Sequence, residues 1–195
     1  ALADELVSSR VGAHRVRVAS RGVEFDGDAS VGYRALLWTR MGTRVLELLT
    51  SAQYGIDDPS QLHGLAAETI PWTKLVSSSG SLCVDAILGV TSPNLSHSHF
   101  CALTVKNAAI DVFRAAGCAE RPSVDTVSPD LPVVVYLHRG AATIYRSLGG
   151  PGSLHKRGYR SGAAIHSASL RETVAAGCLA LADWSGMVEA HVAGG

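Results

Sequence analysis

A run of basic residues in the last third of the sequence suits the binding of a polyanion. Residues 131–171 contain no Asp or Glu, although the whole chain is neutral, with 17 Lys and Arg against 17 Asp and Glu. Arg suits phosphate because its guanidinium donates two parallel hydrogen bonds, and a local positive field attracts polyanions. A loop with ordinary solvated surface charge is an equally weighted alternative. The candidate contacts are Arg146, His155, Lys156, Arg157, Arg160 and Tyr159, whose ring can stack on an unpaired base.

Other chemistry has little support in the residue types and their spacing. His97 and His99 form the best metal pair, but residues two apart point in different directions on a helix, and no nearby acid or cysteine completes a ligand set. Pro151 interrupts the glycines at 149–152, which favours a turn over a phosphate loop. No G-x-S-x-G, G-x-x-x-x-G-K-[ST] or H-E-x-x-H motif occurs. We therefore expect no metal site and assign no catalytic residue.

The composition predicts a folded protein of one large or two small domains. Hydrophobic residues make up 47% of the 195 residues, and charged residues only 17%. No apolar run reaches the roughly 18 residues that span a bilayer, and the first residues lack the basic region of a signal peptide. The four cysteines are far apart, and Cys83, Cys101 and Cys178 are predicted to be small buried hydrophobic residues. A reducing compartment fits this pattern, either the bacterial cytoplasm or an organelle matrix, and no membrane partner is expected.

The first fifty residues predict a small α/β unit. A helix at 2–9 is followed by strands at 14–20 and 22–27, a helix capped by Asp28, and a strand at 43–50. This order of elements is typical of a ferredoxin-like unit whose first strand is missing.

The rest of the chain predicts a second α/β unit and a final helix. Asp57 or Asp58 before Pro59 marks a helix that ends near residue 70. A strand at 82–90, buried on both faces, precedes a long helix at about 93–116 and a hairpin at 133–146 that turns at Arg139 and Gly140. The last helix is expected at 167–184, and residues 185–195 have no clear pattern.

The long helix has an apolar stripe that sets the position of Lys106. The stripe is predicted to include Phe100, Leu103, Ile110 and Phe113, and a period of 3.6 residues puts Lys106 beside Leu103 and Ile110. A Lys at that edge can lay its methylenes on apolar neighbours and keep its ammonium in water, with no further role.

Several spaced blocks of sequence resemble one family. They are R-G-V-E-F-D-G-D (21–28), Y-R-A-L-L-W-T-R (33–40), I-P-W (70–72), V-K-N-A-A-I-D (105–111), R-P-S-V-D (121–125) and L-H-K-R-G-Y-R (154–160). In this order they are similar to the N-terminal half of the THUMP-domain methyltransferases that modify guanine N2 in large-subunit ribosomal RNA. The resemblance spans residues 1–184.

The resemblance implies an α/β (α+β) fold in three parts. Residues 1–50 would form the ferredoxin-like segment, 51–160 the THUMP domain, and 161–195 a connector helix toward a methyltransferase domain. It also implies that Lys106, in a recurring block of the THUMP half, extends the basic surface of residues 154–160 toward ribosomal RNA. Ser169 stands where the family has Pro.

The family's S-adenosylmethionine motifs do not occur in these residues. After Trp184 the family continues to Asp-Pro-x-Cys-Gly-Ser-Gly and Asn-Pro-Pro, whereas this sequence reads S-G-M-V-E-A-H-V-A-G-G. We therefore expect this chain to bind RNA without a cofactor of its own, and S-adenosylmethionine to serve the parent enzyme. The alternatives are an enzyme with an unrecognised site and a non-catalytic protein-interaction or ribosome-assembly module.

Overall fold

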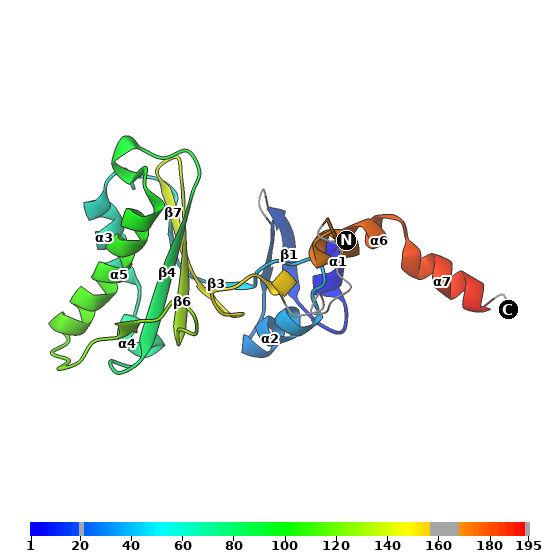
Figure 1. The fold of residues 1–195 in the computed structure, drawn as a ribbon, viewed down its shortest axis with the longest axis horizontal. Helices are drawn as coiled ribbons and strands as arrows, with labels where there is room; N and C mark the ends of the chain where they lie inside the picture. The colour runs from blue at the N-terminus through cyan, green and yellow to red at the C-terminus, as the bar shows by residue number, and fades with distance from the viewer. Residues whose placement is uncertain (20–21, 157–167, 194–195) are drawn as a thin grey trace. The chain divides into compact units, whose positions relative to one another are not determined.

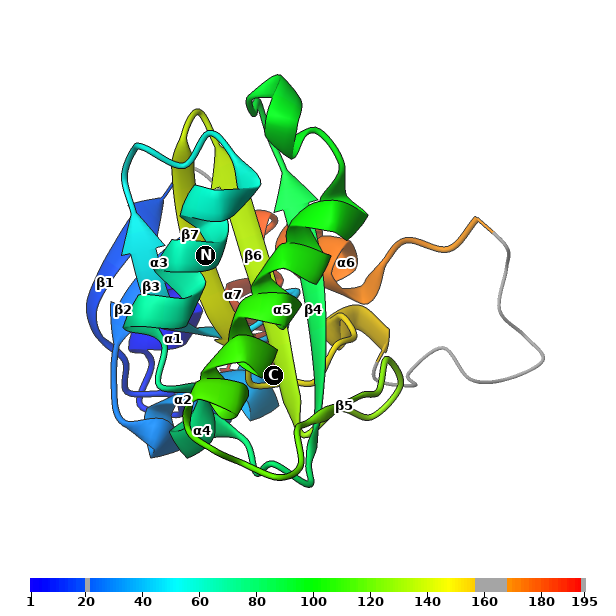
Figure 2. The same ribbon diagram turned by 90° about the vertical axis from the view of Figure 1, so that its left-hand side faces the viewer.

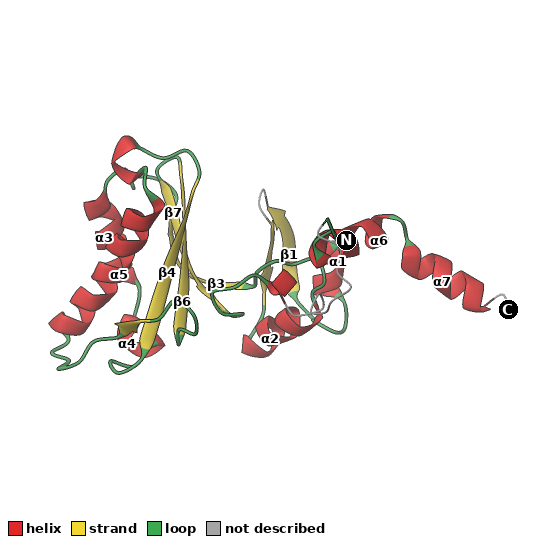
Figure 3. Ribbon diagram, in the orientation of Figure 1, coloured by secondary structure: helices red, strands yellow, loops and turns green. Residues whose placement is uncertain are grey.

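The computed structural model describes residues 1–19, 22–156 and 168–193, with the side chain of Lys156 outside the described part. The chain divides into two compact units, one made of residues 1–45 and 152–195 and the other of residues 46–151. Figure 3 colours the helices and strands of both units.

The first unit begins with a helix and a two-stranded antiparallel sheet. The structure confirms the helix and both strands that the pattern predicts for residues 2–27. It also confirms the cap, because the Asp28 carboxylate accepts a hydrogen bond from the backbone N of Val31 at 2.9 Å. Hydrogen bonds from the Ser30 hydroxyl and then from the Val31 amide lower the pKa of Asp28. The elements are α1 (Leu2–Val7), β1 (His14–Ala19), β2 (Gly22–Asp26) and α2 (Ala29–Trp38).

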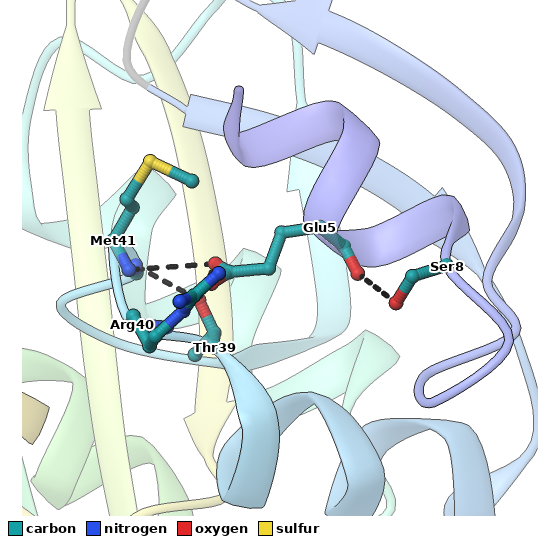
Figure 4. Close-up of polar contacts among 6 residues, drawn as sticks. Glu5, Ser8, Thr39, Arg40 and Met41 are labelled. Atoms are coloured by element: carbon teal, nitrogen blue, oxygen red, sulfur yellow. Dashed lines mark hydrogen bonds and ion pairs between the residues drawn. The ribbon is translucent and has the colours of Figure 1, made fainter. Parts of the chain in front are cut away.

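A buried carboxylate joins the two helices of this unit. The Glu5 side chain on α1 is only 8% exposed. Its oxygens accept hydrogen bonds from the Thr39 hydroxyl at 2.9 Å and from the backbone N and the Nε of Arg40 at 2.9 and 3.1 Å (Figure 4). The donors follow the last turn of α2, so Glu5 fixes the end of that helix to α1.

The second unit is built on a five-stranded sheet in the order β3-β7-β6-β4-β5. The strand expected at 43–50 is β3, and it pairs with β7 in this larger sheet rather than with β1 or β2. Its assignment to the first unit is therefore wrong for residues 46–50. Strands β4 and β6 run parallel, while β7 is antiparallel to both of its neighbours. The strands are β3 (Leu46–Ala52), β4 (Ser81–Leu88), β5 (Ser123–Val124), β6 (Leu131–His138) and β7 (Ala141–Ser147).

Two helices cover one face of this sheet, as Figures 1 and 2 show. They are α3 (Pro59–Thr69) and α5 (Ser98–Ala115), and the short α4 (Trp72–Leu75) follows α3. Trp72 is fully buried, and its indole N–H donates to the Ala66 carbonyl at 2.8 Å. The buried core also contains Leu62, Leu82, Val105, Phe113, Leu131, Val135 and Ile144. Strand β4 buries Leu82 and Ala86 on this face but exposes Asp85 on the other, so the prediction that both faces are buried is wrong.

The β6–β7 hairpin confirms the predicted turn. Arg139 and Gly140 have φ values of 51° and 72°, and the pair closes a loop of two residues between His138 and Ala141. Positive φ at both positions defines the turn that matches strand twist. Arg139 is a non-glycine residue in the left-handed region, which is uncommon.

Helix α5 differs from its prediction at its start and on its buried face. Residues Pro93–Leu95 form a separate 3-10 turn, so the helix begins at Ser98 rather than at 93. Phe100 is 62% exposed and Leu103 is 37% exposed, so they do not belong to the core. Ala108, Ile110 and Phe113 are buried as predicted, and the other buried residues of the helix are Cys101, Val105 and Ala109.

Two helices end the chain where one was expected. They are α6 (Glu172–Leu181) and α7 (Trp184–Ala193), separated by Asp183 at a positive φ of 49°. Cys178 on α6 is exposed, against the prediction that it is buried. Among the described residues, no helix has the length and apolar character to cross a membrane.

Candidate RNA interface

The basic residues predicted from the sequence lie in both units. Arg146 is on β7, and its Nε lies 3.3 Å from the Glu47 carboxylate of the neighbouring strand β3. The guanidinium is therefore already paired, and a phosphate would have to share it with Glu47.

His155 belongs to a short 3-10 turn, Leu154–Lys156, in the first unit. Its Nδ1 lies 2.7 Å from the Ser153 hydroxyl. The carbonyl of Thr43 accepts hydrogen bonds from the backbone N of Leu154 and from the Ser153 hydroxyl, at 2.8 and 3.1 Å. These contacts hold the start of the basic loop. Arg157, Tyr159 and Arg160 lie outside the described residues, as does the side chain of Lys156.

Lys106 lines a groove of about 590 Å³ in the second unit. One wall is the outer face of α5, and the other is the segment that leads into the edge strand β5. Arg146 does not line it. The lining residues are Lys106, Asn107, Ile110, Asp111, Arg114, Arg121, Pro122, Ser123 and Val124.

The groove carries a net positive charge. Its lining includes three cations, Lys106, Arg114 and Arg121, and a single acid, Asp111, which leaves a balance of +2. Asp111 is neutralised locally, because its carboxylate lies 2.9 Å from Nη1 of Arg114 and 3.1 Å from Nε2 of His63. Within the described part of the chain, neither Lys106 nor Arg121 has an ion-pair partner.

Two acids flank the groove without lining it. Glu120 precedes Arg121, and Asp125 follows β5. The Asp125 carboxylate accepts hydrogen bonds from the backbone N of Val127 at 2.8 Å and of Ser128 at 3.1 Å, and these bonds lower its pKa. Asp125 is therefore ionised at neutral pH and is engaged with its own turn.

Two blocks that are separate in sequence meet at this groove. The block 105–111, with Arg114 just beyond it, supplies the α5 wall, and residues 121–124 supply the facing wall. The sequence prediction included Lys106 but neither Arg114 nor Arg121. For Arg121 the available signal was that its block, like that of Lys106, contains a cation; Arg114 lies outside both blocks.

The histidine pair His97 and His99 lies at the start of α5. Both rings contact Phe100, with centroid distances of 5.0 and 5.9 Å. In the parts of the chain that are described, no group of three or more His, Cys, Asp or Glu residues could hold a metal ion.

Two known domain families match parts of this chain. Residues 1–46 match the model of the RlmL ferredoxin-like domain, and residues 65–146 match the model of the THUMP domain. The chain is therefore similar to an RlmL-type ferredoxin-like domain over residues 1–46 and to a THUMP domain over residues 65–146. Both the Lys106 and the Arg121 walls of the groove lie in the THUMP match.

Longer proteins align with nearly the whole of this chain. The chain is 37% identical over 185 residues to the ribosomal RNA large subunit methyltransferase K/L of Aeromonas salmonicida, and 39% identical over 183 residues to that of Chromohalobacter salexigens. These alignments cover 95% and 94% of this chain. The chain spans 24% of the length of each of these relatives.

Solved structures share the fold of the ferredoxin-like and THUMP domains. A possible methylase from Clostridium difficile superposes with a TM-score of 0.74 at 21% identity, over 92% of this chain and 45% of that one. TrmN from Thermus thermophilus superposes with a TM-score of 0.63 at 25% identity, over 93% of this chain and 52% of that one.

Proposed function

We propose that this chain is the RNA-binding module of an S-adenosylmethionine-dependent rRNA (guanine-N2)-methyltransferase, and that it presents ribosomal RNA to a catalytic domain elsewhere in a longer protein. The observation that carries the proposal is that this chain matches both an RlmL ferredoxin-like model and a THUMP model and aligns over 95% of its length with a relative named as a ribosomal RNA methyltransferase. S-adenosylmethionine would bind the catalytic domain of that longer protein.

The proposed contacts are those of a surface that reads RNA by shape and phosphate position. Lys156, Arg157 and Arg160 would bind phosphates, and Tyr159 would stack on an unpaired base. Arg146, His155 and Lys106 would supply further contacts to the RNA. Because phosphate contacts carry little sequence information, discrimination would come from RNA shape and unpaired bases.

The test is the salt dependence of RNA binding by the whole chain. Replacing Lys156, Arg157 and Arg160 together with Gln should weaken binding, and each lost phosphate contact should flatten the slope of log affinity against log salt by about 0.7. A second triple variant, Arg15, Arg17 and Lys74 to Gln, removes the same charge at exposed positions outside the proposed site. If both triple variants lose RNA affinity equally, the loss is caused by the change in net charge, and the assignment of the loop as an RNA contact fails.

A protein-interaction function has one observation in its favour. Helices α6 and α7 bury none of their residues, and they expose several large apolar side chains. These include Leu181, Trp184, Met187 and Val192. If the whole chain shows no salt-dependent RNA affinity, this second function replaces the first.

A further inference from the structure

We propose that the groove between α5 and β5 is a phosphate-binding track for RNA, separate from the loop at 154–160, in which Lys106 and Arg121 hold the backbone of one strand from opposite walls. The inference rests on the proposed function and deepens it, because it gives the THUMP domain a contact site of its own.

Helix geometry places the cations of the first wall in one row. Lys106, Ile110 and Arg114 are four residues apart in sequence, so their side chains follow one another along the outer face of α5. The row faces residues 121–124, where Arg121 stands just before the edge strand β5. A chain of phosphates laid between the walls would meet a cation on each side.

Part of the groove lining is apolar. Ile110 is 9% exposed and Pro122 is buried. Val124 is exposed at the same edge and can pack against a sugar or a base.

The ion pair inside the groove orients one cation. The Asp111 carboxylate accepts a hydrogen bond from Nη1 of Arg114. Its other oxygen lies within hydrogen-bond distance of Nε2 of His63, on α3. A guanidinium has five N–H donors, so Arg114 can keep this contact and still donate to a phosphate oxygen. Asp111 therefore orients Arg114 and lowers the net positive charge of the groove by one.

The size and chemistry of the groove favour RNA over an acidic peptide. A volume of about 590 Å³ is that of a ligand-sized cleft rather than of an isolated anion hole. Asn107 lies beside Lys106 and offers an amide that can both donate to and accept from a base edge or a ribose hydroxyl. Arg121 and Arg114 match phosphate geometry through their planar forks.

The test measures binding of the whole chain to a short fluorescein-labelled RNA hairpin with a single-stranded 3′ tail. Arg121→Gln should flatten the log–log salt slope by about 0.7, and the double variant Lys106→Met, Arg121→Gln by about 1.4. The affinity lost per phosphate contact, relative to the unmodified chain, should be about eightfold larger at 50 mM salt than at 1 M salt. Lys74→Gln is the matched control, since it removes one exposed positive charge from the same unit outside the groove.

The outcomes separate this inference from the proposed function. If the unmodified chain binds RNA and the folded double variant binds with the same slope, the groove is not a binding site and the RNA-binding function stands. If the unmodified chain does not bind, the function itself fails. Arg121→Lys keeps the charge and should retain most of the slope, which guards against a loss caused by misfolding. If polyglutamate displaces the hairpin as well as unlabelled RNA does, the groove is an acidic-peptide site and the inference is overturned.

Discussion

At the scale of single residues, Lys106 lies at the edge of the buried face of α5, as the helical spacing predicts. Its neighbours Ala109 and Ile110 are buried, whereas Leu103 is partly exposed. The half-buried stem of Lys106 lies in the groove beside Ile110. A Lys that serves only to cover apolar surface would be replaceable by any side chain of similar shape.

Lys106→Met separates these two roles. The methylene stem is kept, so the free energy of unfolding should fall by less than about 1.5 kcal/mol. RNA affinity should still fall, with a salt slope smaller by about 0.7, because one phosphate contact is lost. Chemical denaturation and fluorescence anisotropy measure the two effects. Leu103→Met on the preceding turn is the control, and equal RNA binding by both variants would make Lys106 structural.

Asp111→Asn should change binding in the opposite direction. The substitution keeps the size of the side chain and an oxygen that can accept from Arg114, but it raises the net charge of the groove lining from +2 to +3. We expect tighter RNA binding at low salt, with the gain fading as salt screens the added charge. Glu68→Gln on α3 removes one exposed negative charge elsewhere in the same unit and should have a smaller effect. Weaker binding by Asp111→Asn would mean that the orientation of Arg114 matters more than the charge.

Glu5→Gln tests the buried carboxylate of the ferredoxin-like domain. An amide places a donor where one of the carboxylate oxygens now accepts from Thr39 or Arg40 (Figure 4). Loss of charge-assisted hydrogen bonds in a buried position should destabilise this domain by about 2 kcal/mol. A thermal unfolding curve measures the loss, and Asp4→Asn on the same helix should shift the midpoint much less, because Asp4 pairs with the terminal amine at the surface.

At the scale of elements, the stabilisation of α3 by its N-cap residue Asp58 depends on pH. The Asp58 carboxylate accepts hydrogen bonds from the Ser60 hydroxyl at 2.6 Å and from the backbone N of Ser60 and Gln61 at 2.8 and 3.2 Å. The Ser60 hydroxyl makes the largest contribution to lowering the pKa of Asp58 below its ordinary value of 3.8, and the Gln61 amide follows. Because the folded pKa is the lower one, the stabilisation is present above pH 3.8 and is lost as the pH falls through the folded value.

Asp58→Asn isolates this contribution, since Asn still caps the helix but does not titrate. The stability advantage of the unmodified chain over the variant should be constant above pH 3.8 and should shrink as the solution becomes more acidic. Urea unfolding of both chains across the acid range measures the difference. Two curves that stay parallel down to pH 2 would show that the cap does not depend on charge.

The sequence predicted the type of most elements and failed where tertiary pairing decides. The hairpin turn at Arg139 and Gly140 and the caps at Asp28 and Asp58 depend on neighbours in sequence, and the structure confirms them. The partner of β3 could not be read from its own residues, because β7 lies almost a hundred positions away. Helix α5 has two apolar stripes, and only the packing of the sheet decides that Cys101 and Val105 are buried while Phe100 is exposed.

The groove could also be predicted only in part from the sequence. Lys106 could be selected because it stands in a resembling block on a predicted helix. Arg121 could not be paired with it, because the segment between α5 and β6 read as an irregular loop and the two-residue strand β5 has no pattern of its own. Only the parallel pairing of β5 with β4 brings Arg121 into the wall that faces α5.

At the scale of the whole molecule, the THUMP-containing unit is continuous in sequence and the other unit is not. All members of the main buried cluster, from Ile56 to Ile144, lie within residues 46–151. A unit that contains its whole core and all five strands of its sheet needs no other segment to bury its apolar surface. The basic loop at 154–160 belongs to the other unit, whose two segments enclose this one in sequence.

Residues 46–151 alone should therefore fold cooperatively and bind RNA less tightly than the whole chain. The groove cations Lys106, Arg114 and Arg121 are retained, so affinity should remain salt-dependent and should still fall with Arg121→Gln. The loss of the loop removes the second set of contacts, and two linked sites bind more tightly than either one because the second contact is intramolecular. Circular dichroism during urea unfolding tests the fold, and anisotropy titration with the same RNA hairpin tests the binding. If the isolated unit folds but has no affinity for RNA, the loop carries all of the binding, and the groove has no part in it.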